Sequence, residues 1–243
     1  MRLIIAFAVA AIVFALLERI GAALPRKPLF RRERLVDFVY WLFTPVVTRT
    51  LSSVSLFAAI ALLAPPRSSW FASQSKLAQI IELLVAADFI GYWTHRAFHR
   101  GALWRIHAIH HSSRDLDWLS ASRLHPLNEI ITRLTQVVPL YLLGFRNDAL
   151  VAIVPILTFW AVFIHANVRW DFGPLRYVIA TPRFHRWHHT SEDEGLDKNF
   201  AGLFPWIDLL FGTFYMPDRQ PVTFGVREEI PNGLLGQLAH PFR

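Results

Sequence analysis

The chain has 243 residues, of which 53% are hydrophobic and 14% aromatic, and its mean hydropathy is +0.33. A composition this apolar indicates an integral membrane protein, and the net charge of +7 is typical of basic cytoplasmic loops, so we expect no nucleic-acid partner. Because the sequence contains no cysteine, disulfides, cysteine-ligated zinc and iron–sulfur clusters are excluded.

The first apolar segment covers residues 3–17. One interpretation is a secretory signal peptide, with Ala22 and Ala23 as a weak cleavage site. The other is a membrane helix. Five basic residues follow between positions 26 and 34, and such a basic loop favours the cytoplasmic side. We therefore expect a first membrane helix whose N-terminus lies outside.

Four further apolar segments follow, at residues 36–64, 77–93, 129–143 and 149–164. The first of these contains Arg49, so it forms either one tilted helix or an interfacial helix followed by a short span. The last two are marginal in length and form either a full hairpin or a re-entrant one. Either hairpin returns the chain to the side it left. The expected fold is an all-α integral membrane bundle of about four to five spans.

Eight histidines form three tight clusters, which the predicted topology brings to one side of the membrane. They are His95 and His99, then His107, His110 and His111, then His185, His188 and His189. Spacings of three and four residues place the side chains of a cluster on one helical face. Eight imidazoles are too many for one metal ion and suit two. Imidazole binds iron, zinc, copper and nickel, so the spacing alone does not select the metal.

Three residues outside the clusters are also candidates for the site. His125 and His165 each lie at the end of a predicted span, and either could complete the coordination of one ion; the alternative is a hydrogen-bonded structural histidine. Asp88 lies on the same helical face as His95 and His99. We expect its carboxylate to accept the second ring N–H of a ligand histidine.

The sequence around these residues resembles the fatty acid hydroxylase / sterol desaturase superfamily of membrane histidine-rich di-iron oxygenases. The resemblance covers roughly residues 80 to 215. The matching segments run from Asp88 to His99, Trp104 to His111, Arg123 to Pro126, His165 to Asn167, Thr181 to His189, Asn199 to Phe200 and Trp206 to Thr213. The chain departs from the commonest pattern at Ala201, where a glycine often follows Asn-Phe.

The resemblance implies a single membrane domain over residues 1–243, with a cytosolic helical cap that carries a histidine-rich dimetal site. Within it, residues 1–76 would form N-terminal membrane helices, 77–215 the catalytic region and 216–243 a C-terminal tail. It implies two iron ions, bound by the eight clustered histidines together with His125 and His165. It also implies that Asp88, Asn199 and Asp208 support the ligands from outside.

The reaction that the resemblance implies is the hydroxylation or desaturation of a lipid with O2. The lipid would be a sterol, fatty acyl, sphingoid or ether lipid. The electrons would come from an external donor protein, either cytochrome b5-like, a ferredoxin or a reductase. The protein would be a multi-pass membrane protein whose metal site faces the cytoplasm, in a bacterial inner membrane or, alternatively, the ER membrane.

Two other functions are compatible with the histidine clusters. A zinc-dependent membrane hydrolase would use the same ligands. A metal store or transporter would need several ionisable residues deep inside the spans, whereas Arg49 in the second span and Glu82 and Asp88 in the third are too few to line a path. The sequence therefore favours the oxygenase over both.

Overall fold

The computed structural model describes residues 2–25, 32–63 and 69–243. Its α-helices are α1 (Arg2–Gly21), α2 (Arg32–Phe43), α3 (Arg49–Ala61), α4 (Trp70–Ser73), α5 (Lys76–Phe98), α6 (Gly101–His111), α7 (Pro126–Leu142), α8 (Asn147–His165), α9 (Pro182–His188), α10 (Trp206–Leu210) and α11 (Leu234–Ala239). Short 3₁₀ helices cover Trp118–Ser122, Gly173–Tyr177, Asp193–Gly195 and His240–Phe242. The described residues contain isolated β-bridges but no strand, which confirms the expected all-α fold.

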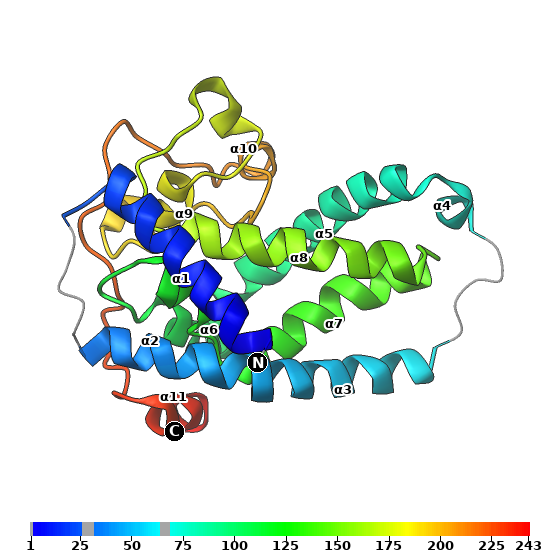
Figure 1. Ribbon diagram of the computed structural model, residues 1–243, viewed down its shortest axis with the longest axis horizontal. Helices are drawn as coiled ribbons and strands as arrows, with labels where there is room; N and C mark the ends of the chain where they lie inside the picture. Colours follow the sequence, from blue (N-terminus) through cyan, green and yellow to red (C-terminus); the bar gives the residue numbers. More distant parts are fainter. Residues whose placement is uncertain (1, 26–31, 64–68) are drawn as a thin grey trace.

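The molecule is elongated, with a helical bundle at one end and a cap at the other (Figure 1). Helices α3, α5, α7 and α8 run along the long axis, while α6, α9 and α10 lie at the cap end. Three helices within the described residues are long and apolar enough to cross a membrane, at Glu33–Ala61, Lys76–Phe98 and Asn147–His165. Helices α1 and α7 are not among these three.

The segment around Arg49 forms one long helix and not two separate ones. A π-helical turn at Thr44–Thr48 joins α2 to α3 without a break. Pro45 explains this turn, because a proline has no N–H to donate and disturbs the regular α-helical pattern. The N–H of Arg49 instead donates to the Thr44 carbonyl, five residues back. The Thr44 hydroxyl donates to the Ser122 carbonyl at 3.0 Å, which ties the turn to the cap.

Side-chain caps set the start of two of the helices that carry candidate ligands, α5 and α9. Ser75 caps α5 by accepting the N–H of Ala78, and Thr181 caps α9 by accepting the N–H of Phe184. Pro182 then occupies the first position of α9, where its missing N–H costs nothing. The bundle is held by an apolar cluster that includes Leu83 of α5.

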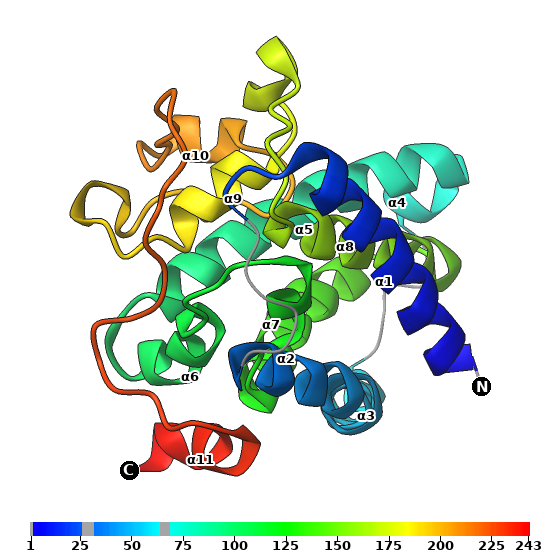
Figure 2. The ribbon, with the colours of Figure 1, turned by 60° about the vertical axis from the view of Figure 1, so that its left-hand side comes forward.

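Helix α1 packs against α2 and against the 3₁₀ helix Trp118–Ser122; the ring centroids of Phe7 and Phe38 of α2 are 5.6 Å apart. Phe14 stacks on Trp118 with ring centroids 5.8 Å apart. The end of α1 is tied to the segment after α8, because the Ala23 N–H donates to the Asn167 carbonyl at 3.2 Å and the Arg169 N–H donates to the Gly21 carbonyl at 2.8 Å. Figure 2 shows α11 at the far side of α2, close to α6.

Candidate metal site

Nine histidines meet where the bundle joins the cap. His95 and His99 lie at the end of α5, His165 ends α8, and the others belong to α6 and to α9 with its C-cap. They form a group of five, His95, His99, His107, His111 and His188, and a group of four, His110, His165, His185 and His189. Within each group the candidate ligand nitrogens all lie within 4.8 Å of one another.

Six of these rings have an oxygen acceptor at Nδ1. His95 faces the Phe200 carbonyl at 2.7 Å, His99 the Asp197 carboxylate at 3.1 Å, His107 the Asn128 side-chain oxygen at 2.8 Å, His110 the Arg123 carbonyl at 3.1 Å, His165 the Ala161 carbonyl at 2.6 Å and His188 the Lys198 carbonyl at 2.8 Å. An oxygen acceptor requires the ring proton on Nδ1, so each neutral ring keeps a lone pair on Nε2.

The Nε2 lone pairs converge on each other. The Nε2 atoms of His95 and His107 are 3.0 Å apart, and those of His110 and His165 are 3.1 Å apart. Neither member of these pairs carries a proton at Nε2, so the short distances are not hydrogen bonds. Two nitrogens bound about 2.1 Å from one ion at right angles would be about 3.0 Å apart. The Nε2 atoms of His99 and His188 are buried without any hydrogen-bond partner. This arrangement fits metal ions.

Burial keeps the imidazoles outside the spans neutral. It holds the pKa values of His107, His110, His111, His185, His188 and His189 well below their usual value, and the neighbouring imidazoles lower them further. Desolvation has this effect because it penalises the charged ring. The rings are therefore in the neutral form that a metal requires at physiological pH.

His125 lies apart from both groups, unlike His165. Its Nδ1 accepts the N–H of Leu127, so it serves as the N-cap of α7, and its Nε2 faces the Leu238 carbonyl at 3.1 Å. Both ring nitrogens are therefore occupied. The structure therefore places His125 outside both groups, as the alternative of a hydrogen-bonded structural histidine predicted.

Asp88 contacts no ligand histidine, which differs from the expected role. Its carboxylate accepts the backbone N–H groups of Gly202, Leu203 and Phe204 at 2.7–3.0 Å. It therefore holds the segment that carries the Phe200 carbonyl, the acceptor for His95. Helical periodicity places Asp88 on the ligand face, but the loop after residue 199 comes between.

Asp208 and Asn199 support the same segment. Asp208 accepts the N–H groups of Phe200 and Ala201 at 2.8 and 2.9 Å. Asn199 donates from its side chain to the carbonyls of Phe184 and Tyr215. Its backbone has φ +60°, a left-handed conformation that asparagine tolerates well. All three residues thus act on the histidines through the backbone of this segment.

Sequence reasoning did not find Asn128 and Asp197, which accept from His107 and His99. Asn128 follows His125 by three residues at the start of α7, where periodicity could have placed it facing the cap. Asp197 has φ +56° in an irregular loop, and no periodic signal marks its side-chain direction.

Comparisons with known proteins agree with this site. The family model for fatty acid hydroxylase matches residues 80–213. Ornithine lipid hydroxylase of Rhizobium tropici is 32% identical over 243 residues, covering 95% of this chain and 72% of that protein. Human alkylglycerol monooxygenase is 33% identical over 148 residues, covering 60% of this chain and 32% of that protein.

A putative methylsterol monooxygenase of Dictyostelium discoideum is 29% identical over 140 residues, covering 56% of this chain and 51% of that protein. The chain thus spans a third to a half of the length of these last two relatives. No solved structure matches the chain significantly. The family match covers more than half of the chain and includes all nine grouped histidines, so the chain belongs to the fatty acid hydroxylase family.

Proposed function

We propose that this protein is a membrane-bound oxygenase that uses two iron ions, O2 and external electrons to hydroxylate or desaturate a lipid. The observation that carries the proposal is the pair of adjacent all-histidine groups of five and four rings, of which His95 and His99 are partly buried and the others are buried. A metal-storage protein would need only a high affinity for metal. Here the histidines lie inside the protein, between the helical bundle and its cap. When bound, iron supplies the one-electron and O2 chemistry that amino-acid side chains lack.

The chain itself orients the ligands. The acceptor at Nδ1 fixes the tautomer of a ring and turns its Nε2 toward the group. For His95 and His188 these acceptors are main-chain carbonyls of one segment, those of Phe200 and Lys198. The Asp88 and Asp208 carboxylates hold that segment, so the ligand geometry depends on buried hydrogen bonds well outside the site.

Aromatic side chains exclude water from the group of five. Phe98 stacks on His107 with centroids 5.3 Å apart, and Trp104 lies 5.2 Å from His99. Phe200 closes another side, 5.0 Å from His99. A dry site suits an oxidant that attacks C–H bonds, because water would allow side reactions.

The proposed substrate is a membrane lipid, and ornithine lipid is the first candidate. The relative that aligns with 95% of the chain is named for that lipid, and the other two are named for alkylglycerol and methylsterol. The electron donor would be a separate cytochrome b5-like protein, ferredoxin or reductase. The metal site would face the cytoplasm, where such donors and their reductants are found.

The test combines metal analysis with product analysis. Protein purified from iron-supplemented cells should contain two iron ions per chain and consume O2 with a reduced donor and ornithine lipid. Mass spectrometry should detect the gain of one oxygen atom or the loss of two hydrogens. His188→Ala should abolish O2 consumption and product formation, and His125→Ala should not. Stoichiometric zinc with lipid cleavage and no O2 uptake would instead identify the zinc-dependent hydrolase.

A further inference from the structure

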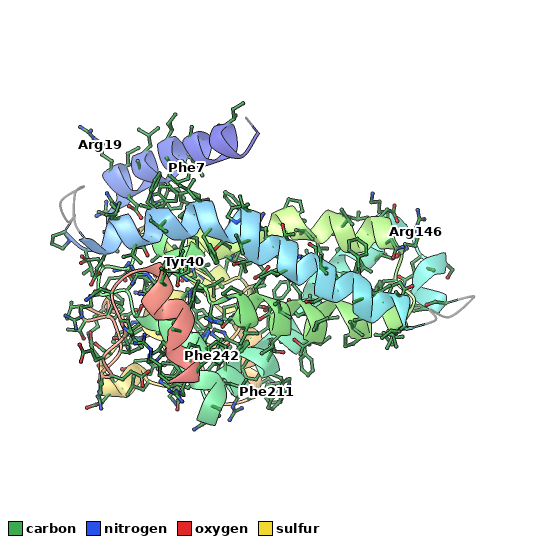
Figure 3. The ribbon with its side chains drawn as sticks, turned by 90° about the horizontal axis from the view of Figure 1, so that it is seen from below. Phe7, Arg19, Tyr40, Arg146, Phe211 and Phe242 are labelled. Atoms are coloured by element: carbon green, nitrogen blue, oxygen red, sulfur yellow. The ribbon has the colours of Figure 1, made fainter. Side chains whose placement is uncertain are left out.

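A cavity of about 910 Å³ lies between α1 and α2, beside the cap. Its walls are apolar side chains from both helices, among them Phe7, Ala11 and Leu16 of α1 and Leu35 and Phe38 of α2. Figure 1 shows α1 crossing α2 at an angle, and Figure 3 shows Phe7 toward the middle of the molecule and Arg19 at the cap end. The walls have the length and character to hold part of an alkyl chain.

The cap end of the cavity is polar and carries both signs of charge. Four arginines and three carboxylates line it, so the charges almost balance. One pair neutralises itself, because the Arg34 guanidinium contacts the Asp117 carboxylate at 2.7 Å. A site for a purely anionic head group would be expected to carry a clear excess of basic residues.

Arg186 brings a buried positive charge to this cavity. Its side chain is 1% exposed, its Nη1 donates to the Leu116 carbonyl at 3.1 Å and its Nε has no partner. Among the described residues, no carboxylate lies within ion-pair distance of it. Glu18 and Asp117 act on this guanidinium only from beyond that distance, and a buried guanidinium without a direct ion pair favours an anionic ligand group here.

Glu18 brings a buried carboxyl group to the same cavity. It is 7% exposed, and one of its oxygens accepts the N–H groups of Trp118 at 3.2 Å and Asn167 at 2.9 Å. In the part of the chain that the structure describes, no basic side chain forms an ion pair with it. Burial penalises the ionised form of this carboxyl, and a bound ammonium would stabilise that form.

The polar end of the cavity adjoins the metal site. Arg186 directly follows His185, and Asn167 follows His165 by two residues. The Asn167 side chain also donates to the Leu24 carbonyl at 2.9 Å, which fastens the end of α1 at this place. The cavity therefore lies between the apolar walls of α1 and α2 and the segments that carry His165 and His185.

We propose that this cavity binds the head group of a zwitterionic membrane lipid, with its anionic group at Arg186 and its ammonium at Glu18. The proposal deepens the proposed function and rests on it, since it names the class of lipid that the oxygenase recognises. The acyl chain of this lipid lies along the apolar walls of α1 and α2. Neutral diacylglycerol lacks both charges, and anionic phosphatidylglycerol lacks the ammonium.

The test measures the binding of ornithine lipid with tritiated acyl chains to the full chain in detergent, without O2 or an electron donor, so that no turnover occurs. Glu18→Gln keeps an oxygen for the two backbone N–H groups and removes only the charge. It should weaken binding roughly 10- to 100-fold, the range for a lost hydrogen bond to a charged group. Glu82→Gln is the matched control, because Glu82 bonds to Gln74 outside the cavity, and it should bind as the unaltered chain does.

Two further measurements test the apolar wall and the preference for a zwitterionic lipid. Ala11→Trp fills the apolar wall without changing any charge and should also weaken binding. Unlabelled phosphatidylglycerol should compete at least about 10-fold less well than ornithine lipid, as expected when one charged contact is missing, and diacylglycerol, which lacks both, should compete no better than phosphatidylglycerol. Equal competition, unchanged binding by Glu18→Gln, or no binding to the unaltered chain overturns the proposal.

The outcomes also separate the two proposals. Charge-dependent binding without any oxidised product would leave the cavity assignment standing and reject the oxygenase. Oxidation of the lipid by a Glu18→Gln variant that binds it with unchanged affinity would leave the oxygenase standing and reject the cavity assignment.

Discussion

At six of the nine grouped histidines, one ring nitrogen is committed to an oxygen acceptor and the other faces its group. The acceptors differ in kind: four are main-chain carbonyls, one is the amide of Asn128 and one is the carboxylate of Asp197. A main-chain acceptor cannot be removed by a side-chain substitution, so the ligand geometry is protected by the segments that carry the carbonyls.

The grouped and ungrouped histidines should respond differently to substitution. We expect His107→Ala to lose most of the bound metal, because His107 faces both His95 and His111 at Nε2. His125→Ala should retain the metal, since both of its ring nitrogens are used elsewhere. Metal content per chain, measured on membrane-inserted protein, checks both. Metal loss from His125→Ala equal to that from His107→Ala would contradict this assignment.

Asp88 should affect the metal indirectly. We expect Asp88→Asn to weaken metal retention by ~10–100-fold, as outer partners of ligands typically do. An asparagine has one acceptor oxygen in place of two, so it cannot accept all three N–H groups of residues 202–204 as well. Competition with a chelator measures the retention. Glu82→Gln, in the same helix, is the control, and equal retention in both variants would remove Asp88 from the supporting network.

Among the elements, α2 and the segment before α7 are joined by a buried ion pair. Arg123 Nε donates to the Asp37 carboxylate at 2.6 Å, and both side chains are almost fully buried. The Arg123 carbonyl is the acceptor for His110, so this link connects the long helix of the bundle to the group of four.

Removing one partner of this ion pair should destabilise the fold. We expect Asp37→Ala to lower the free energy of unfolding by about 3–5 kcal/mol, because it leaves a buried guanidinium without its counter-ion. Unfolding with SDS in mixed micelles measures the change. Asp148→Ala removes an exposed ion pair with Arg146 and should leave the unfolding midpoint unchanged. Similar midpoints for the two variants would show that the buried pair contributes little.

For the whole molecule, the bundle separates two ends. Arg146 lies at the end opposite the cap (Figure 3), whereas Arg227 lies in the cap, where it pairs with the exposed Asp193. Because the chain has no cysteine, a single introduced cysteine reports its own position only.

Labelling should identify the side of the metal site. If the cap lies in the cytoplasm, as we propose, a membrane-impermeant maleimide should label Arg146→Cys and not Arg227→Cys in intact spheroplasts. Both should react after the membrane is opened with detergent. Labelling of Arg227→Cys alone in intact spheroplasts would place the cap outside.

The sequence by itself determined the membrane character, the all-α class and the eight clustered histidines, because composition and helical periodicity are local properties. Only the tertiary structure decided how the histidines divide. His188 joins the group of five, while its neighbours His185 and His189 join the group of four. Consecutive residues point about 100° apart on a helix, so which group each ring reaches depends on the elements packed around α9.

The packing of segments that are distant in the sequence also separates His165 from His125 and explains the role of Asp88. Both histidines lie at helix ends with similar local sequence signals, but only His165 ends a helix that packs against α9. Asp88 lies on the expected face of α5, and the loop at residues 200–204 occupies the space between it and the ligands. Spacing along the chain predicts the face of a side chain; the long-range packing of other segments determines what that face meets.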